Sequence, residues 1–299
     1  MVVMSAKRTT VLIIGVMLSL LMISPAFGET EKAKENYNKG IQDKQAGNLE
    51  AAVVAFKAAI AEDAEYGDAY VQLGAIYYGQ KDYQKALESF TTATEKTPQN
   101  ADAFANLGRV HIKLKKYEKA QAALLTATSL NAGDAAVQLE LCKAYYYGRN
   151  YAEAISVATK LHESGGGDHI SHFILGKAYQ KTNKPSQAIP ALKESVKLKS
   201  NYYNAHSALG AIYLGQGNYP SAAASFKAAL KAKPTAYKAS YNYAVSVQSG
   251  DSENYAAIIK AYEGFIKMAK KNPKAKTLVA EAQTIVKNSK IAQEEASLQ

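Results

Sequence analysis

Small and apolar residues recur along this chain with a period of 34 residues. Leucine returns at that spacing five times without a gap, at Leu73, Leu107, Leu141, Leu175 and Leu209. The position that follows it is small in every copy, occupied by Gly40, Gly74, Gly108, Cys142, Gly176, Gly210 and Ala244. Self-similarity at a fixed period of this length predicts an array of stacked supersecondary units.

The second half of each period has its own two columns. An alanine column runs through Ala52, Ala86, Ala120, Ala154, Ala188 and Ala222. Four residues after each alanine comes Phe56, Phe90, Leu124, Ala158, Leu192 or Phe226. A four-residue step places both positions on one helical face. Each period therefore predicts two amphipathic helices joined by a short polar turn, for example Gly79 to Asp82.

These columns resemble the tetratricopeptide repeat, and the best copy runs from Gly67 to Asn100. It carries the family's pattern in Tyr70, Leu73, Gly74, Tyr77, Tyr83, Ala86, Phe90, Ala93 and Pro98. The resemblance implies an all-α, right-handed superhelical solenoid in which neighbouring repeats bury each other's apolar faces. We expect a solenoid over 29–273 with seven repeats, at 33–66, 67–100, 101–134, 135–168, 169–202, 203–236 and 237–275. A capping helix with a frayed tail is expected at 274–299.

Departures from the pattern predict local effects in the first and fourth repeats. Lys39 and Asp43 make the first helix of the first repeat polar, which suits an end cap. Ala158 stands in the phenylalanine column, and Gly165–Gly167 closes the same repeat. These features predict looser packing there and either a hinge or a plain flexible turn.

The seventh repeat departs in length. Phe265 and Pro273 lie 39 residues beyond Phe226 and Pro234, so we expect an insertion of five residues, around 248–254.

Residues 1–28 have the layout of a secretory signal peptide. Lys7 and Arg8 precede an apolar run from Val11 to Ile23, and small residues follow at Ala26 and Gly28. The apolar run has 13 residues, whereas a membrane span needs roughly 20. We therefore expect cleavage before Glu29 and a periplasmic mature protein. Secretion, or anchoring to the inner membrane by an uncleaved leader, remains open.

Composition narrows the classes of partner and chemistry. The 299 residues include one cysteine, which excludes a disulfide framework and a zinc site built from paired cysteines. A net charge of +10 admits an anionic partner. Export, and the lack of a basic run interleaved with glycine or aromatic residues, weigh against nucleic acid. We expect no nucleic-acid partner.

No strong catalytic signature occurs in the sequence, so we expect neither an enzyme nor a cofactor. One cluster suggests a metal site: His162, Glu163, Asp168, His169 and His172. However, His172 falls in an aromatic column that packs between helices in this family, so we interpret it as a core histidine and expect no metal. Cys142 replaces a glycine of the small column and is interpreted as a buried apolar residue.

The resemblance also implies a concave groove, lined by a second stripe on the first helix of each repeat, where extended peptides or partner helices bind. The candidate groove residues are Asn106, Arg109, Lys113, Lys143, Tyr146, Tyr147, Phe173, Lys177, Lys181, Tyr241 and Asn242. Arg109, Lys143 and Lys177 form a basic column, which suits an acidic segment with apolar anchors. The alternative is that these cations are only solvated helix surface.

One specialised role is disfavoured by the same residues. The members of the family that grip the acidic carboxyl terminus of chaperones use Lys and Asn at fixed places on three successive first helices. Asn106 and Asn242 match one such place, but their Lys and Asn partners in neighbouring repeats are missing.

Charge is uneven along the chain. Acidic residues outnumber basic ones from Glu29 to Asn100, and basic residues outnumber acidic ones from Ala101 to Lys290. We expect a non-enzymatic scaffold in the bacterial cell envelope that docks a protein or peptide partner in its groove. Three alternatives remain: an adaptor that binds an anionic membrane or cell-wall polymer through the basic carboxyl-terminal half, a self-assembling homo-oligomer, and an accessory subunit of an enzyme complex.

Overall fold

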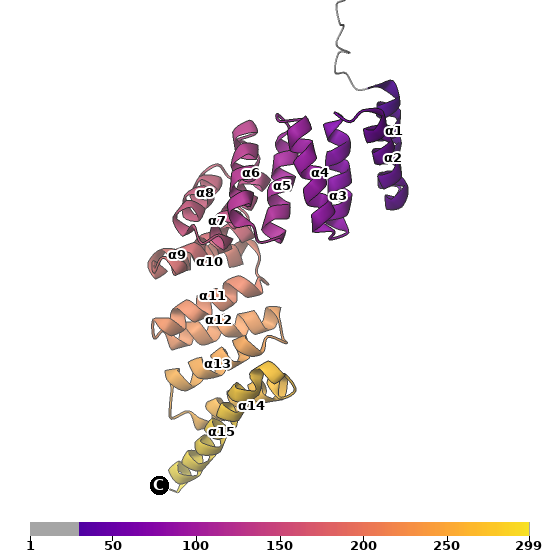
Figure 1. The fold of residues 1–299 in the computed structure, drawn as a ribbon. Coiled ribbons are helices and arrows are strands. Elements are labelled where there is room, and N and C mark those ends of the chain that lie inside the picture. Colours follow the sequence, from indigo (N-terminus) through magenta and orange to yellow (C-terminus); the bar gives the residue numbers. More distant parts are fainter. Residues whose placement is uncertain (1–29, 299) are drawn as a thin grey trace, which may run out of the picture. The chain divides into compact units, whose positions relative to one another are not determined.

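The computed structural model describes residues 30–298, and the leader expected at 1–28 lies outside them. The described chain contains fifteen α-helices and one short 3-10 helix, with no strand in that range (Figure 1). The predicted all-α array of helix pairs is confirmed. No helix within 30–298 is long and apolar enough to cross a bilayer.

The helices alternate as the period predicts. The first helices of the seven pairs are α1 (Glu31–Gln45), α3 (Gly67–Gly79), α5 (Ala101–Lys113), α7 (Ala135–Tyr147), α9 (His169–Lys181), α11 (Tyr203–Gly215) and α13 (Tyr237–Gly250). The second helices are α2 (Leu49–Glu62), α4 (Tyr83–Lys96), α6 (Tyr117–Leu130), α8 (Tyr151–Glu163), α10 (Pro185–Leu198), α12 (Tyr219–Ala232) and α14 (Tyr255–Ala269). The chain then forms η1 (Pro273–Ala275) and α15 (Lys276–Ser297).

The chain divides into two compact units, and α1 with α2 forms the first, which ends at Tyr66. Within it, Tyr37 lies between two other rings, with its centroid 5.6 Å from that of Phe56 and 5.0 Å from that of Tyr66.

The second unit holds α3 to α15 and begins at Gly67. Each of its helices packs against the next along the chain, and each first helix also contacts the first helix of the following pair. The first helices α3, α5, α7, α9, α11 and α13 therefore form one continuous row (Figure 1).

Turn geometry repeats with the same period. In six pairs the turn between the two helices contains one residue in the left-handed region, namely Gly47, Lys81, Lys115, Arg149, Asn183 and Gly217. The second helix begins two residues later, and the Asp82 carboxylate caps α4 by accepting from the Lys85 N–H at 3.2 Å. Four of the six left-handed residues are not glycine, although this conformation costs an L-residue about 1 kcal/mol.

The small column is explained by close contact between the two helices of a pair. A Cβ atom at Gly74 would lie 2.8 Å from the Phe90 ring, and one at Gly210 would lie 2.8 Å from the Phe226 ring. Gly108 is equally tight against the Leu124 side chain. A larger residue in this column would therefore hold the two helices of a pair apart.

The fourth pair keeps this packing by exchanging sizes, contrary to the looser packing predicted from Ala158. Cys142 and Ala158 are both fully buried and belong to one core cluster. The Cys142 side chain fills space that is empty where this column holds glycine. Ala158, in turn, is smaller than the leucine or phenylalanine at the same position of other repeats. Leu161 fills the next column, where most repeats have alanine, and is 1% exposed.

The glycines after the fourth pair are also held closely. A Cβ atom at Gly166 would lie 2.7 Å from Leu161 Cδ1 and 2.9 Å from the Ala135 Cβ. Gly167 is as close to the His162 ring. This close approach, together with the positive φ of 78° at Gly165, accounts for the three glycines.

The predicted insertion of five residues in the seventh pair is wrong. The helix α14 begins 36 residues after α12, so the insertion before it is two residues beyond the 34-residue period. Tyr262 therefore takes the place of Phe226; it is 1% exposed and lies in one core cluster with Ala244. Phe265 packs one turn later, and Pro273 begins η1.

The terminal helix α15 covers α14, as a capping helix is expected to do. Ala282, Val286 and Ser289 are its buried residues. The tail expected to fray from Gln293 instead continues as helix through Ser297, with exposed side chains.

Replacing Gly108 tests the small column. We expect Gly108→Leu to lower the free energy of unfolding by about 2 kcal/mol or more, because the new side chain meets Leu124. Gly264→Leu is the matched control, since a Cβ at this helical glycine meets nothing within 4 Å and removing a helical glycine gains roughly 0.5–1 kcal/mol. Urea unfolding followed by circular dichroism measures both; equal stability of the two variants would count against the repeat register.

The size exchange in the fourth pair predicts a coupled effect. Cys142→Gly leaves a void and Ala158→Leu overfills the site, so each destabilises by about 1–3 kcal/mol. The double variant restores the glycine–leucine pair of the neighbouring repeats and regains most of the loss. A double-mutant cycle in urea then gives a coupling above about 1 kcal/mol, whereas additive losses would show that the two positions do not share one space.

Candidate interaction groove

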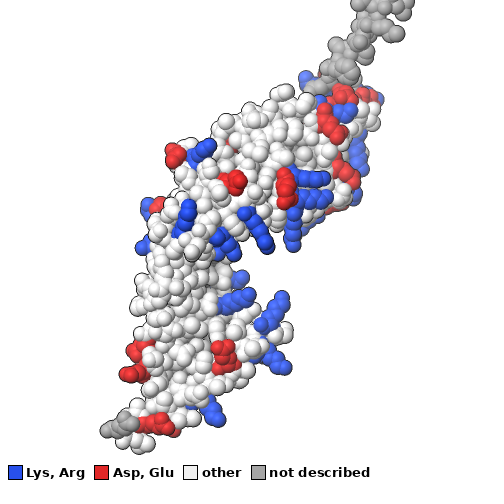
Figure 2. All heavy atoms as spheres, turned by 60° about the vertical axis from the view of Figure 1, so that its left-hand side comes forward, with Lys and Arg blue, Asp and Glu red and all other residues white. Residues whose placement is uncertain are grey.

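The predicted groove residues lie on first helices of the second unit. The helix α5 carries Asn106, Arg109 and Lys113; α7 carries Lys143, Tyr146 and Tyr147; α9 carries Phe173, Lys177 and Lys181; α13 carries Tyr241 and Asn242. Because α5, α7 and α9 contact one another in order, the residues from these three helices share one row. In the space-filling view, Lys and Arg side chains gather on the hollowed side of this unit (Figure 2).

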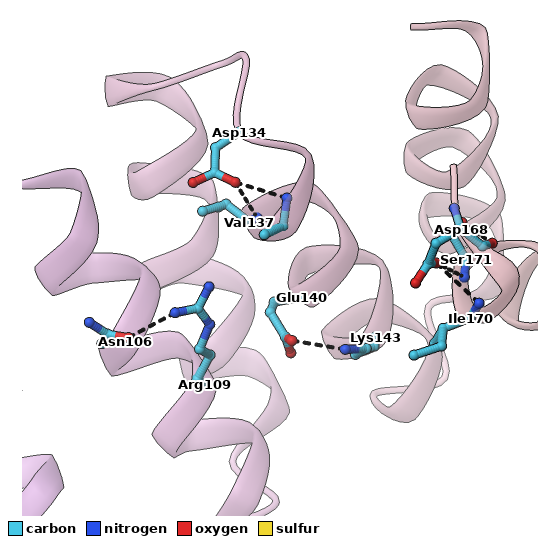
Figure 3. A network of polar contacts seen from close by, with 10 residues as sticks. Asn106, Arg109, Asp134, Val137, Glu140, Lys143, Asp168, Ile170 and Ser171 are labelled. Carbon is cyan, nitrogen blue, oxygen red and sulfur yellow. Dashed lines mark hydrogen bonds and ion pairs between the residues drawn. The ribbon is translucent and has the colours of Figure 1, made fainter. Parts of the chain in front are cut away.

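Each cation of the basic column has a polar partner on its own helix, and Figure 3 shows the contacts of Arg109 and Lys143. The Arg109 guanidinium donates to Asn106 Oδ1 at 2.9 Å. The Lys143 ammonium lies 2.8 Å from a carboxylate oxygen of Glu140, and each of these side chains is 21% exposed. Glu140 was not among the predicted groove residues. It lies three residues before Lys143 on the same helical face, where opposite charges pair.

Lys177 differs from Lys143 and resembles Arg109, because its side-chain partner is a neutral amide. Its ammonium donates to the neutral Gln180 side chain, and no ion pair to it occurs in the described part of the chain. Burial, with a smaller contribution from Lys181, lowers the pKa of Lys177 below its usual range. The structure thus holds a half-buried cation without a counter-charge.

This cation lies in a pocket of about 200 Å³ between α9 and α11. The lining residues are Phe173, Lys177, Tyr203, Asn204, Ser207, Ala208 and Ala211. Ser207 and Ala211 follow Phe173 and Lys177 by one period, so they continue the predicted stripe into the sixth repeat. No groove residue was predicted in the sixth repeat, because these small residues carry no signal of their own.

Tyrosine rings occupy the α7 part of the row. The Tyr147 side chain is 50% exposed and stacks on Tyr117 with ring centroids 6.1 Å apart. Tyr146 packs against Tyr147 and, on the other side, against Tyr151. Burial raises the pKa of both Tyr146 and Tyr147, which keeps these hydroxyls neutral.

The α13 end of the row is covered by the terminal helix. The Tyr241 hydroxyl donates to a Glu281 carboxylate oxygen of α15 at 2.7 Å, and its ring lies 5.2 Å from that of Phe265. Asn242, next to it, is half-buried. Tyr241 therefore belongs to the contact between α13 and the capping helix.

The histidine cluster forms a packing contact. His162 and His172 stack with ring centroids 3.7 Å apart, and His162 Nε2 lies 3.0 Å from the Ser171 hydroxyl. Within 30–298, no group of three or more possible ligands is placed to hold a metal. Cys142 is fully buried, and burial raises the pKa of its thiol to about 12, so the interpretation as a small apolar residue is confirmed.

Comparison with models of known protein families shows which family the chain belongs to. One model of the tetratricopeptide repeat matches residues 77–140, and another matches 37–101 and 175–246. Together they cover more than half of the chain. The chain belongs to the tetratricopeptide-repeat family. Comparison with curated protein sequences gives no match.

Solved tetratricopeptide-repeat structures share the fold. YrrB, described as a TPR protein with an unusual peptide-binding site, is 23% identical with a TM-score of 0.54, over 67% of this chain and 100% of that one. MamA from Desulfovibrio magneticus RS-1 is 21% identical with a TM-score of 0.54, over 58% and 98%. Cut9–Hcn1 of the APC/C is 21% identical with a TM-score of 0.57, over 72% and 43%.

The histidine stack predicts that acid destabilises the fold. Burial, together with the neighbouring His172, lowers the pKa of His162 from 6.5 to about 4. Between these values the unfolded chain binds a proton that the folded chain does not, so the free energy of unfolding falls as the pH drops through this window. Urea unfolding across the window measures the slope. His162→Gln makes this slope smaller; equal slopes for the wild type and His162→Gln would contradict the assignment.

Proposed function

We propose that this tetratricopeptide-repeat protein docks an acidic segment of a partner protein in the groove formed by α5, α7, α9 and α11. Proteins of this family are in general non-catalytic interaction scaffolds, and the fold of this chain agrees with that role. We infer the acidic character of the partner from the electrostatics around Lys177.

The observation that carries the proposal is the unpaired state of Lys177. A charge removed from water is costly unless it is paired and hydrogen-bonded. Lys143 has Glu140 within 2.8 Å, whereas Lys177 has only an amide oxygen. A partner carboxylate in the α9–α11 pocket supplies the missing counter-charge at a site where water screens the attraction less than at the surface.

Other residues of the row attract the acidic segment and hold it in place. Lys113 on α5 and Lys181 on α9 are exposed and extend the positive potential along the row, which steers an acidic chain toward the pocket. Phe173 and Tyr203 line the pocket, and Tyr147 offers an exposed ring nearer α5. Aromatic anchors of this kind contribute much of the binding energy in protein interfaces.

The proposed setting is the bacterial cell envelope, as the leader at 1–28 predicts. The description of YrrB names a peptide-binding site on a related fold, which supports binding by this kind of array. Capture from envelope extract would identify the partner.

Charge reversal in the groove tests the proposal. The mature chain and its Arg109→Glu, Lys143→Glu, Lys177→Glu variant serve as baits in envelope extract, and a retained protein is cut into segments to find the one that binds. We expect an acidic segment whose affinity falls at least about tenfold in the variant, with unchanged helicity, because attraction becomes repulsion. Fluorescence anisotropy measures the dissociation constants.

The control variant carries the same charge change on the second helices of the same repeats. Lys119, Lys160 and Lys193 are exposed on α6, α8 and α10, so their replacement by Glu alters net charge equally and leaves the groove intact. Affinity in the control remains within about threefold of the wild type, because exposed charges more than a Debye length apart are screened. Undiminished binding by the groove variant, or equal losses in both variants, would refute the basic groove.

A further inference from the structure

We infer that the turn from α14 through η1 into α15 binds phosphate groups of an anionic phospholipid surface. This site lies at the carboxyl-terminal end of the second unit and shares no lining residue with the groove. The inference therefore does not rest on the proposed peptide-binding function.

The turn forms a pocket of about 410 Å³. Its lining residues are Lys270, Lys271, Asn272, Pro273, Lys276, Val279, Ala280 and Gln283. Three lysines thus line one concavity whose remaining lining residues are neutral. The cations come from both sides of η1, because Lys270 and Lys271 precede it and Lys276 begins α15.

Acidic groups that would neutralise these lysines are absent or engaged elsewhere. The segment Gly264–Ala280 contains neither Asp nor Glu. Of the carboxylates that flank it, Glu263 binds Lys290 at 2.8 Å and Glu281 accepts from the Tyr241 hydroxyl at 2.7 Å. Between residues 30 and 298, no ion pair involves any of the three pocket lysines.

The pocket's chemistry suits a phosphate group. Lysine binds phosphate as a point charge, and several ammonium groups can share the oxygens of one phosphate. Asn272 and Gln283 also line the pocket, and their side-chain amides can donate hydrogen bonds to a phosphate. Val279, Ala280 and Pro273 line the pocket with apolar surface, which lowers the local dielectric and strengthens the attraction for an anion.

The extent of the charge favours a surface of many phosphates over a single free ion. Lys267 and Lys274 are exposed beside the pocket and also lack ion pairs among the described residues. Five lysines therefore lie within ten residues, more than one phosphate can engage. Basic clusters of this density bind anionic lipid headgroups, with each lysine adding to the attraction.

Vesicle sedimentation tests the inference. The full array from Glu29 is mixed with vesicles of phosphatidylcholine that do or do not contain phosphatidylglycerol. We expect binding only to the phosphatidylglycerol vesicles, weakening as salt is raised. Lys270→Gln, Lys271→Gln, Lys276→Gln together reduce the partition coefficient roughly a hundredfold, from three lost lysine contacts.

A variant of equal charge separates the pocket from general basicity. Lys193→Gln, Lys227→Gln, Lys231→Gln removes three exposed lysines from α10 and α12, and we expect it to change partition by less than about threefold. Equal losses in the two variants, binding to neutral vesicles, or no vesicle binding would each overturn the inference. Binding of inorganic phosphate without vesicle binding would also overturn it, since the ligand would then be a free ion.

Discussion

The close approach of the two helices within each pair is the constraint on which the rest of this structure depends. A small residue on the first helix lies directly against a larger side chain of the second, as Gly74 does against Phe90. Because this contact uses one face of the first helix, a different stripe of the same helix remains available. Repetition at 34 residues aligns that stripe from pair to pair and forms the groove.

The residue types that form this contact vary along the chain, while the paired side chains fill a similar space. Glycine faces phenylalanine or leucine in five pairs, cysteine faces alanine in the fourth, and alanine shares a cluster with tyrosine in the seventh. Protein interiors are close-packed, so a gain on one side of such a contact requires a loss on the other. Cys142 is therefore a packing residue, and the raised pKa of its thiol is a consequence of the same burial.

Periodicity predicted the helix pairs and most of the core, because the spacing of small and large residues directly reflects which faces meet. It failed where residue identity was used in place of spacing: Phe265 was matched to Phe226, whereas spacing within α14 assigns that place to Tyr262. Glu140 and the α9–α11 pocket were missed for a different reason. Both depend on side-chain contacts between neighbouring positions, which columns of single residues do not describe.

The groove's charge is thus less uniform than its sequence indicates. Within the described chain, Lys143 is the one cation of the column with a carboxylate partner, whereas Arg109 and Lys177 bond to neutral amides. Lys177 is also half-buried beside small and aromatic residues. We propose that the desolvated Lys177 fixes the register at which a partner binds. Specificity then comes from one desolvated pair, with the exposed lysines contributing mainly to the rate of encounter.

Titration of the lysine side chains by NMR tests this account most directly. With the lysine ε-carbons labelled and Lys177→Arg used to assign its signal, the account predicts that Lys177 titrates below the exposed lysines in the free protein. It also predicts that the pKa of Lys177 rises when an acidic segment is added, because a carboxylate then stabilises the ammonium. A Lys177 that titrates together with the exposed lysines, and does not respond to the segment, would contradict the central claim.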